Sequence, residues 1–534
     1  MKKTEVYKND IKAVLDKDSK YRSFLFKRGY LVTDNNNIDT ESYPFYSLWN
    51  KHTAGKYTIL VHKEQDFAMC EKNGLVAVMI GHAYDPFTMK YDDTDILKDC
   101  LDAYIENNES YFDKINSISG MHLVMVFDND KFTAVQDCGG MRSCYFGKAA
   151  GNIYVTSHPQ LVADLCNLTF DPDVELLFSK KFYTIGTRYM PGNITPYKEL
   201  KRLGANTYLD FNKEFKIVRF YPTRVIKEIE EKDFDKYIDE ISRLLHNNIE
   251  LCTKKWQKPA ISLSGGTDSK TTLACANGLY DKFYYYSFHA KSQEKVDASA
   301  AKTLCDRIGT VHNTYPIPET NEELEDFDFL KKMLNHNTSY VSRPDDHEAR
   351  KFIYMSRVND FDVELKSWIS EIGRAFWSRK YGLELPAKLN ERHFSIFQKR
   401  YFGSPYLLRW ADRIHRDFLR EIDLVTSPEG YEHQDMFYWE VRFASWGTMV
   451  ESMHDFFNLV TMPFNNRKLM ELFLVFPHDM RKSDTVHAMV IDKMNKEIND
   501  SGIAVHNKYL GGKRIIIEHI YYRWRTMFFR SKLK

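Results

Sequence analysis

The stretch that decides the fold is AISLSGGTDS, residues 260–269, in which a short apolar segment leads into a glycine-rich turn. Ala260–Leu263 has the composition of a buried strand, and Lys270–Asn277 reads as a helix that Gly278 stops. A strand, a glycine-rich turn and a helix in this order give the turn a chemical meaning. Two glycines let the backbone approach an anion closely, and the N-terminus of the following helix points free N–H groups at it.

The side chains of the turn extend this anion site. Its residues are Ser264, Gly265, Gly266, Thr267, Asp268 and Ser269. The three hydroxyl groups are hydrogen-bond donors, and Asp268 is placed to hold a Mg²⁺ ion that bridges phosphate oxygens. The alternative is an ordinary glycine-rich turn, which a lone glycine pair would favour. Six residues of this kind between a strand and a helix favour a nucleotide phosphate site, although the turn is not a Walker A loop.

The chain after the turn alternates strand and helix. Phe283–Phe288 reads as a second strand, and a helix that begins at Asp297 ends at Gly309. Residues 310–313 (TVHN) then lead into a third strand. This alternation predicts a parallel sheet in an α/β domain, and the later sequence predicts a largely helical completion.

The first part of the chain reads mainly as strands. Tyr57–Val61, Leu75–Ile80, Met121–Phe127 and Ile153–Thr156 are short apolar runs separated by turn-forming residues. One helix, Asp95–Asn107, interrupts them. From Phe234 onward, apolar residues repeat at three and four, which marks an amphipathic helix, so we place a domain boundary near residue 225.

Composition narrows the functional class. Hydrophobic residues make up 43% and charged residues 28% of the 534, and the formal net charge is +1. These values describe a globular protein of two or three domains with no general attraction to nucleic acid. The eight cysteines form no C-x-x-C pair, and neither a signal peptide nor a membrane-spanning run is found. We therefore expect reduced thiols and a cytoplasmic protein.

Motifs in both halves resemble the asparagine synthetase family. The turn at 264–269 is similar to the PP-loop of ATP pyrophosphatases. In the first half, Ser119–Asp128 (SGMHLVMVFD), Gln136–Arg142 (QDCGGMR) and Tyr154–His158 (YVTSH) resemble the family's glutaminase domain. Met190–Tyr197 (MPGNITPY) resembles its hinge region. The resemblance spans most of the chain, with weak motifs in the first half and a strong one in the second.

The resemblance implies a fold and a domain plan. Residues 1–225 would form an α+β, Ntn-hydrolase-like sandwich. Residues 226–510 would form an α/β PP-loop domain, of the adenine nucleotide alpha hydrolase-like kind, with a helical completion. Residues 511–534 would form a basic C-terminal helix.

The resemblance also implies an activity. It is ATP-dependent adenylation of a carboxylate, which releases pyrophosphate, followed by amide formation with an amine donor and loss of AMP. ATP and Mg²⁺ would be the cofactors. The enzyme would be an asparagine synthase-like carbon–nitrogen ligase.

One departure from the family concerns its glutaminase. The family uses an N-terminal cysteine, whose amine and thiol belong to one residue. Position 2 here is Lys2, and the first cysteine is Cys70. We expect no glutamine hydrolysis, and the resemblance then points to relatives with an inert first domain, such as β-lactam synthetases and lasso-peptide cyclases.

A second departure concerns the family's S-G-x-G-x-D-E loop. The corresponding residues 365–374 (LKSWISEIGR) lack its glycines, and Ser370 stands where an aspartate would be. Glu371 can still supply an oxygen to Mg²⁺, and Arg374 could neutralise a leaving pyrophosphate. A structural ion pair between Glu371 and Arg374, one turn apart, is an equal alternative. Arg343 is either a phosphate ligand or a loop charge.

The family places a catalytic lysine late in the chain. Met462–Leu469 (MPFNNRKL) and Phe476–Lys482 (FPHDMRK) resemble the segments that precede it. Arg481, Lys482 and His487 are the candidates here, and a surface location for all three is the alternative.

The C-terminal segment reads as a basic amphipathic helix over Arg514–Arg530, after a break at Gly511 and Gly512. One face carries Ile516, Ile517, Ile520, Tyr521, Trp524, Met527 and Phe528. The other carries Arg514, His519, Arg523, Arg525 and Arg530. Docking on the protein's own body is the favoured interpretation, and contact with an anionic membrane surface or a partner is the alternative.

Three functions remain open at this stage. The first is the carboxylate–amine ligase, and self-association into a homodimer is left open for it. The second is a ligase that modifies a carboxylate on a larger molecule, in natural-product or surface-glycan assembly. The third is a pseudoenzyme or scaffold, against which the intact Asp268 argues.

Overall fold

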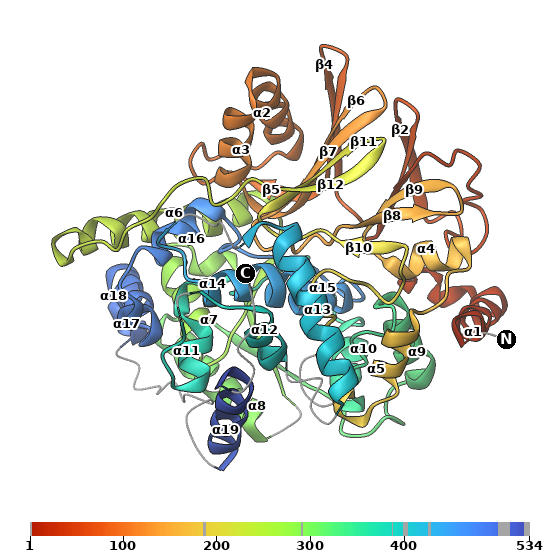
Figure 1. Cartoon of the computed structure of the whole chain (residues 1–534). Helices are drawn as coiled ribbons and strands as arrows, with labels where there is room; N and C mark the ends of the chain where they lie inside the picture. Colours follow the sequence, from red (N-terminus) through yellow and green to blue (C-terminus); the bar gives the residue numbers. More distant parts are fainter. Residues whose placement is uncertain are drawn as a thin grey trace.

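The computed structural model describes residues 3–184, 188–289, 292–386, 388–398, 404–424, 429–499 and 513–527, and within these ranges the strands form three sheets (Figure 1). Two six-stranded antiparallel sheets come from the first part of the chain, and one five-stranded parallel sheet comes from the second. The protein is therefore a mixed α/β structure, as the sequence predicts at this coarse level.

The two antiparallel sheets pack face to face as a sandwich. The first has the order β10 (Leu200–Arg202), β8 (Tyr145–Ala149), β9 (Asn152–Thr156), β1 (Tyr30–Thr33), β3 (Tyr57–His62) and β2 (Trp49–Ala54). The second has the order β12 (Glu214–Arg219), β11 (Thr207–Asn212), β7 (Lys131–Gln136), β6 (Ser119–Asp128), β5 (Leu75–Tyr84) and β4 (Phe67–Lys72). Alternate side chains of both sheets, such as Val32, Ile59, Val78 and Leu123, form one buried core between them.

The outer face of the second sheet is covered by two helices. α2 (Asp93–Glu106) and α3 (Asn108–Ser117) lie beside β5 and β4 (Figure 1). The sequence predicts the first of these helices from Asp95, and the structure begins it two residues earlier. Asp92 is its N-cap, and its carboxylate accepts a hydrogen bond from the Asp95 N–H.

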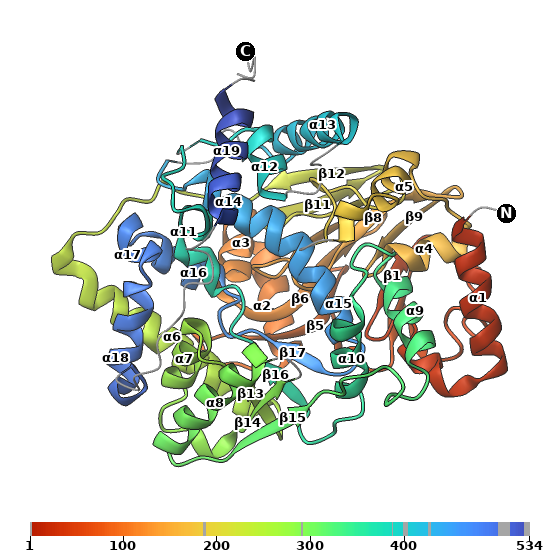
Figure 2. The ribbon, with the colours of Figure 1, turned by 90° about the horizontal axis from the view of Figure 1, so that it is seen from below.

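The parallel sheet has the order β15 (His312–Pro316), β14 (Tyr284–His289), β13 (Pro259–Ser262), β16 (Val363–Leu365) and β17 (Leu459–Thr461). It is preceded by the long amphipathic helix α6 (Phe234–Lys255). α7 (Thr267–Cys275) and α8 (Ser292–Arg307) connect its first three strands and lie beside it (Figure 2). The second and third strands, which the sequence places at 283–288 and after residue 310, are confirmed.

Further helices complete the molecule. They are α1 (Lys3–Lys17), α4 (Pro159–Cys166), α5 (Pro172–Phe178), α9 (Phe327–Asn337), α10 (Asp346–Met355), α11 (Phe376–Tyr381), α12 (Glu391–Gln398), α13 (Pro405–Glu421), α14 (His433–Phe437), α15 (Thr448–His454), α16 (Arg467–Leu474), α17 (His478–Lys482), α18 (Thr485–Asn499) and α19 (Lys513–Met527). A π-helical segment, Tyr438–Gly447, joins α14 to α15. Over the part of the chain that the structure describes, no helix is both long and apolar enough to cross a bilayer.

A buried polar junction joins the sandwich to the segment that follows β17. Asn465 donates from Nδ2 to Asp137 Oδ1 at 2.9 Å. Arg467 donates to the carbonyl oxygens of Gln136 and Asp137 at 3.1 and 3.0 Å. Its Nε donates to Asn206 Oδ1 at 3.0 Å. The guanidinium is fully buried, so these acceptors depend on it for their hydrogen bonds.

Replacing Arg467 by alanine should destabilise the whole protein. The change leaves buried carbonyl oxygens without a donor and opens a cavity, so we expect a loss of about 3 kcal/mol or more in the free energy of unfolding, measured with urea. Lys468→Ala is the control, because Lys468 forms a surface ion pair with Asp113 and should change stability by about 0.5 kcal/mol or less. Equal losses in the two variants would contradict the role given to Arg467.

Candidate functional site

The strand order of the parallel sheet reverses between β13 and β16. β14 and β15 lie on one side of β13, and β16 and β17 lie on the other. In open α/β sheets, ligands bind outside the carboxyl ends of the strands at such a point. β13 ends at Ser262 and β16 at Leu365, and the two strands are paired in parallel, so the loops that follow them leave the sheet together. The topology therefore places the glycine-rich turn where a ligand is expected.

The turn is held by its own hydroxyl groups. The Gly266 N–H donates to Ser264 Oγ at 3.2 Å, and Ser269 Oγ donates to the carbonyl oxygens of Ser264 and Gly266 at 3.0 and 3.1 Å. A Cβ atom on Gly266 would lie 3.2 Å from Ser264 Oγ, so a larger residue would crowd this arrangement. Gly265 forms the bend between them. The turn is thus shaped before any ligand arrives.

The structure starts the helix earlier than the sequence predicts. α7 begins at Thr267 rather than Lys270, so Thr267, Asp268 and Ser269 form its first turn. No side chain of the described residues caps its first N–H groups. Uncapped donors at a helix N-terminus attract an anion, and here they face the cleft at the sheet's carboxyl edge.

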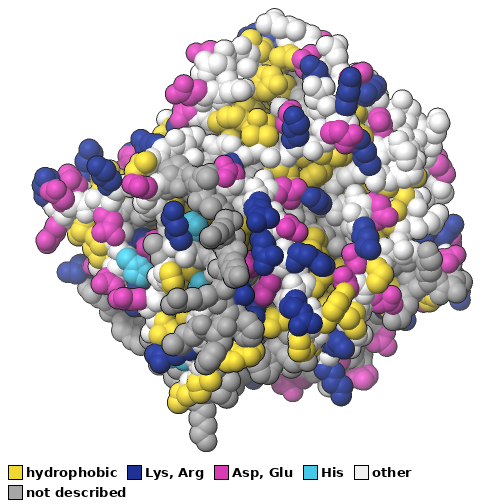
Figure 3. All heavy atoms as spheres, in the orientation of Figure 1, with side chains coloured by type: hydrophobic (Ala, Val, Ile, Leu, Met, Phe, Trp, Pro, Cys, Tyr) yellow, Lys and Arg dark blue, Asp and Glu magenta, His cyan; other side chains and the backbone are white. Residues whose placement is uncertain are grey.

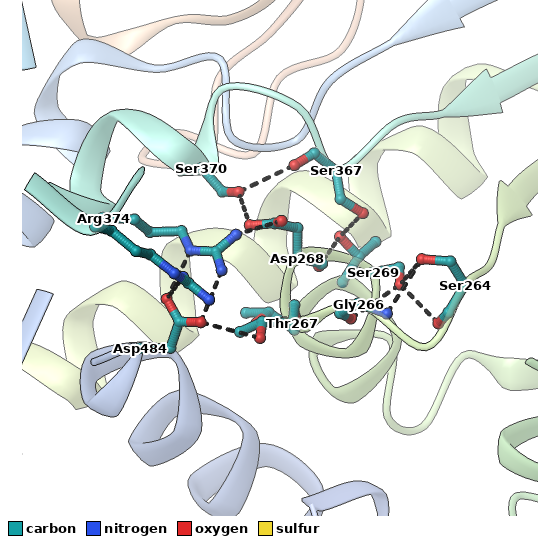
Figure 4. A network of polar contacts seen from close by, with 12 residues as sticks. Ser264, Gly266, Thr267, Asp268, Ser269, Ser367, Ser370, Arg374 and Asp484 are labelled. Carbon is teal, nitrogen blue, oxygen red and sulfur yellow. Dashed lines mark hydrogen bonds and ion pairs between the residues drawn. The ribbon is translucent and has the colours of Figure 1, made fainter. Parts of the chain in front are cut away.

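Asp268 belongs to a network that crosses three segments of the chain (Figure 4). Ser370 Oγ donates to one of its oxygens, and Arg374 contacts the other. The same Arg374 donates to both oxygens of Asp484, from Nε at 2.8 Å and from a terminal nitrogen at 2.7 Å. Thr267 Oγ1 donates to Asp484 at 3.3 Å. Arg374 is therefore a cation shared by two carboxylates.

This arrangement corrects one alternative drawn from the sequence. Arg374 forms its ion pairs with Asp268 and Asp484, not with Glu371 one turn away. Burial opposes ionisation of Asp484, but hydrogen bonding and the charge of Arg374 lower its pKa to about 2. Burial and the nearby Asp268 raise the pKa of Glu371 to about 8. Ser370 serves as a hydrogen-bond donor to Asp268.

Asp268 and Glu371 could supply some of the ligands of a magnesium ion, and phosphate oxygens would have to supply others. Glu371 Oε2 is buried and has no hydrogen-bond partner among the described residues, and the Asp268 carboxylate is near enough to raise the pKa of Glu371. Over the same residues, no group of three or more His, Cys, Asp or Glu could hold a metal by itself. Mg²⁺ is commonly held by one or two carboxylates together with substrate phosphates, so this donor pair suits a metal that arrives with a nucleotide.

The turn opens into a cleft of about 450 Å³, a size that accommodates a small-molecule ligand. Its lining comes from five places in the chain. They are the turn itself, the end of β14 with the start of α8, one face of α10, the loop after β16, and α15. Both Asp268 and Glu371 line it, whereas Arg374 lies behind Asp268.

A buried polar group at the wall of the cleft, around Lys366 and His454, was not predicted from the sequence. Lys366 lines the cleft, and its Nζ lies 2.6 Å from Glu364 Oε1. Among the described residues, Glu364 Oε2, both oxygens of Glu451 and His454 Nδ1 are buried without a hydrogen-bond partner. These residues come from β16 and α15 and meet only in the fold. Their spacing along the sequence gives no signal, because Glu364 and Lys366 alone read as a strand.

The electrostatics of this group follow from burial. Burial raises the pKa of Glu451 to about 8, and the charge of Asp455 contributes. Burial lowers the pKa of His454 well below its ordinary value, and the positive charges of Lys366 and Lys351 add to this effect. The cleft therefore offers a neutral imidazole within reach of the charge of Lys366.

A glycine of the sandwich supports the second loop of the site. A Cβ atom on Gly139 would lie 2.4 Å from Ile369 Cδ1, and the Gly139 N–H donates to Asn465 Oδ1 at 2.7 Å. Ile369 has φ of 80°, a conformation that a β-branched residue adopts only when its surroundings impose it. Ser370 and Glu371 follow directly. The sandwich thus helps to set the position of Glu371.

The remaining candidates lie away from the cleft lining. Arg343 donates to the carbonyl oxygens of Tyr340 and Phe178 and stacks on the Phe178 ring. Arg481 is buried between Asp435 and Glu432, which corrects the surface alternative for it. His487 is also buried, stacked on Phe473. Lys482 is the last residue of α17. None of the four lines the cleft, but the charges of Arg374, Asp268 and Asp484 are near enough to act on the pKa of His487.

No cysteine stands at the start of the sandwich's first strand. β1 begins at Tyr30, whose N–H donates to Ser157 Oγ within a continuous chain that includes α1. Cys70 lies inside β4, and burial raises the pKa of its thiol. A thiol within a strand cannot share a residue with a free amine.

Comparison with known proteins gives a limited likeness. No protein-family model and no curated protein sequence matches the chain. Among solved structures, an allosteric regulatory enzyme of purine biosynthesis is 10% identical, covers 46% of this chain and 57% of its own, and has a TM-score of 0.23. The alignment therefore spans less than two thirds of that protein.

Two further solved structures are similar to this extent. Glutamine phosphoribosylpyrophosphate amidotransferase from B. subtilis, complexed with ADP and GMP, is 10% identical, with 70% of this chain and 74% of that chain covered and a TM-score of 0.23. Glutamine-dependent NAD⁺ synthetase from Acinetobacter baumannii, in complex with ADP, is 14% identical over 28% of each chain, with a TM-score of 0.15. Scores this low carry no argument about function, which must come from the site.

The raised pKa of Glu451 predicts a pH dependence of stability. The folded state keeps a proton on Glu451 from its ordinary pKa of 4.5 up to about 8, whereas the unfolded state releases it. The stability of the protein should therefore fall as pH rises across this window. Glu451→Gln removes the titration, so its free energy of unfolding, measured with urea, should fall less across this window, by a difference of about 1.4 kcal/mol or more.

The matched control for this measurement is Glu109→Gln, at an exposed position in the first turn of α3. Its stability should follow the wild-type pH curve. Parallel curves for wild type and Glu451→Gln would show that Glu451 does not titrate with a raised pKa.

Proposed function

We propose that this chain is an ATP-dependent carboxylate–amine ligase of the asparagine synthetase-like kind. It adenylates a carboxylate with release of pyrophosphate and then joins the acyl group to an amine. The observation that carries the proposal is the uncapped turn 264–269 at the switch point of a parallel sheet, with Asp268 and Glu371 side by side in the same cleft. This geometry supports phosphate binding with a metal between phosphate and carboxylates.

In this proposal the two halves of the protein correspond to known architectures. The antiparallel sandwich is an Ntn-hydrolase-like domain without its nucleophile, and the parallel sheet with its helices is a PP-loop domain. The motifs at 119–128 and 136–142 and the turn at 264–269 support these assignments. Boundaries near 225 and 510 are part of the proposal.

The chain's own residues would act in the following way. The first-turn N–H groups of α7 and the hydroxyls of Ser264, Thr267 and Ser269 hold the phosphates. Asp268 and Glu371 hold Mg²⁺, which neutralises phosphate charge when it is bound. Arg374 orients Asp268 from behind and adds positive charge near the leaving pyrophosphate. The carboxylate and amine partners occupy the side of the cleft lined by Lys366, Trp368 and His454.

A second candidate is a non-catalytic nucleotide-binding scaffold. The observation in its favour is that both oxygens of Asp268 are already engaged, one by Ser370 and one by Arg374. If these contacts persist with nucleotide bound, Asp268 cannot serve the metal. ATP would then bind without turnover.

ATP–pyrophosphate exchange separates the two candidates. With Mg²⁺ and a panel of carboxylates that includes aspartate, the wild type should incorporate labelled pyrophosphate into ATP. Asp268→Asn should lower this exchange by at least about a hundredfold, because it removes the negative charge proposed to hold the metal beside the phosphates. The thermal midpoint of the variant should stay close to that of the wild type.

Asp281→Asn is the control for charge removal at an exposed position remote from the cleft, and it should exchange normally. Normal exchange in Asp268→Asn would remove Asp268 from the metal site. ATP binding without exchange for any carboxylate would favour the scaffold.

Glutamine should not serve as a nitrogen source through hydrolysis in the sandwich. Incubation of the purified protein with glutamine and ATP should release no glutamate above the blank, because no residue at β1 combines a free amine with a thiol. Cys70→Ser should leave this baseline unchanged. Steady glutamate release that disappears in Cys70→Ser would show an active glutaminase.

A further inference from the structure

The C-terminal helix α19 is attached to the body through polar contacts. Arg525 is buried and pairs with both oxygens of Asp412 on α13 at 2.9 Å. His519 hydrogen-bonds the carbonyl oxygen of Tyr381 on α11. Tyr522 is buried beside them. The side of the helix that docks is thus the one with an arginine and a histidine that the sequence assigns to the outer, polar face.

The apolar row of α19 points the other way. Ile516, Ile520 and Trp524 are spaced by four, so they lie on one side of the helix, and they are 58, 63 and 46% exposed. Arg523 is exposed and flanks this row. Helices normally bury such a row, so an exposed one marks a surface that contacts something else. The C-terminal residues Gly511, Gly512, Phe528 and Arg530, and the side chains of Arg514, Ile517 and Met527, lie outside what the structure describes.

α13, the helix to which Arg525 is paired, presents basic side chains of its own. Arg409, Arg413 and Arg420 are exposed and repeat at helical spacing along one side of α13. Figure 3 shows Lys and Arg side chains along α13 down the middle of one face, and apolar side chains at the lower left of the same face, where Figure 1 has α19. Asp417 is exposed on the same helix and reduces this charge by one. The pair between Arg525 and Asp412 fixes the two helices relative to each other.

We propose that the outer sides of α13 and α19 form a docking surface for an anionic lipid bilayer. Ile516, Ile520 and Trp524 enter the boundary between headgroups and acyl chains, and the arginines of α13 with Arg523 contact lipid phosphates. Apolar insertion and attraction to anionic headgroups together provide interfacial binding without a spanning helix. The proposal is independent of the catalytic function.

Charge favours a bilayer over a second copy of this chain. Residues 513–534 contain seven Lys or Arg and one Glu. A twofold contact would bring the same basic surface of two copies together, so like charges would face each other. An anionic bilayer presents the opposite charge over a wide, flat area and an apolar interior below it. Both chemical features of the surface then have a partner.

The test is sedimentation of the full chain with extruded vesicles. One set is phosphatidylcholine alone, and the other is an equal mixture of phosphatidylcholine and phosphatidylglycerol. We expect binding to the anionic vesicles that weakens at high salt and little binding to the neutral ones. Ile516→Ser combined with Ile520→Ser should reduce the partition coefficient about tenfold or more. Arg409→Gln combined with Arg413→Gln should reduce it about fivefold or more.

Matched controls lie on other faces. Val296→Ser changes a side chain on α8 that is 58% exposed, as Ile516 is, and Lys236→Gln changes an exposed lysine on α6. Both should bind as the wild type does. Thermal midpoints check that all variants are folded, since every changed side chain is exposed.

Four outcomes overturn the proposal. The first is absence of binding to anionic vesicles, and the second is an equal loss of binding in the control variants. The third is unchanged binding in the variant with both isoleucines replaced. The fourth is a loss of binding in a variant that light scattering, without vesicles, shows to have changed from a dimer to a monomer. The third would indicate attraction of a basic surface to any polyanion. The fourth would indicate that a second copy covers the apolar row.

Discussion

The buried carboxylate of Asp137 is the interaction on which the arrangement of the whole molecule depends. Its two oxygens accept hydrogen bonds from the backbone N–H groups of His122, Met141 and Arg142 and from the side chain of Asn465. A buried carboxylate is tolerated only when its lone pairs are satisfied, and here three donors come from the sandwich and one from the segment after β17. Separation of the two halves would leave that acceptor incomplete. This junction also affects the candidate site. The turn that follows Asp137 places Gly139 against Ile369, and it thereby supports the loop that contains Glu371. The sandwich is therefore part of the framework of the candidate site.

Within the site, the decisive feature is one arginine between two carboxylates. Arg374 neutralises Asp268 and Asp484 in the absence of a ligand, while Glu371 stays protonated at neutral pH because burial and Asp268 raise its pKa to about 8. Under the proposed function, a polyphosphate and its metal would change this balance. The metal would favour the ionised form of Glu371 and compete for Asp268, and Arg374, still paired with Asp484, would then be available to phosphate. Such a site would bind the anion and the cation together better than either alone.

The secondary structure around the phosphate turn could be predicted because it is local. The strand before residue 264, the strand after residue 283 and the amphipathic helix from Phe234 follow from periodicity and turn residues, and the structure has them within a few residues. The side chains that contact the phosphate turn could not be predicted from the sequence. Asp484 lies 110 residues from Arg374, and the group at Lys366 and Glu451 joins β16 to α15. Each of these contacts depends on which segments the fold brings together, and no spacing in the chain encodes it. The same limit explains why the sequence favours an ion pair between Glu371 and Arg374 as much as a catalytic role. Helical spacing identifies neighbours along the chain, but it does not show that Asp268 and Asp484 are the stronger partners of Arg374.

The C-terminal helix shows how such a competition is decided. Its amphipathic pattern is plain in the sequence, and a hydrophobic face turned inward is the usual outcome. The body of the protein offers that helix Asp412, which is 8% exposed, together with the carbonyl oxygen of Tyr381. An acidic side chain buried this far needs a cation, and leaving it unpaired costs more than exposing a row of three apolar side chains. Arg525 meets that need, and once it does, the rotation of the helix is set and Ile516, Ile520 and Trp524 must face outward. The exposed row is thus the consequence of a buried ion pair. It is also the part of α19 whose apolar surface a lipid bilayer would remove from water.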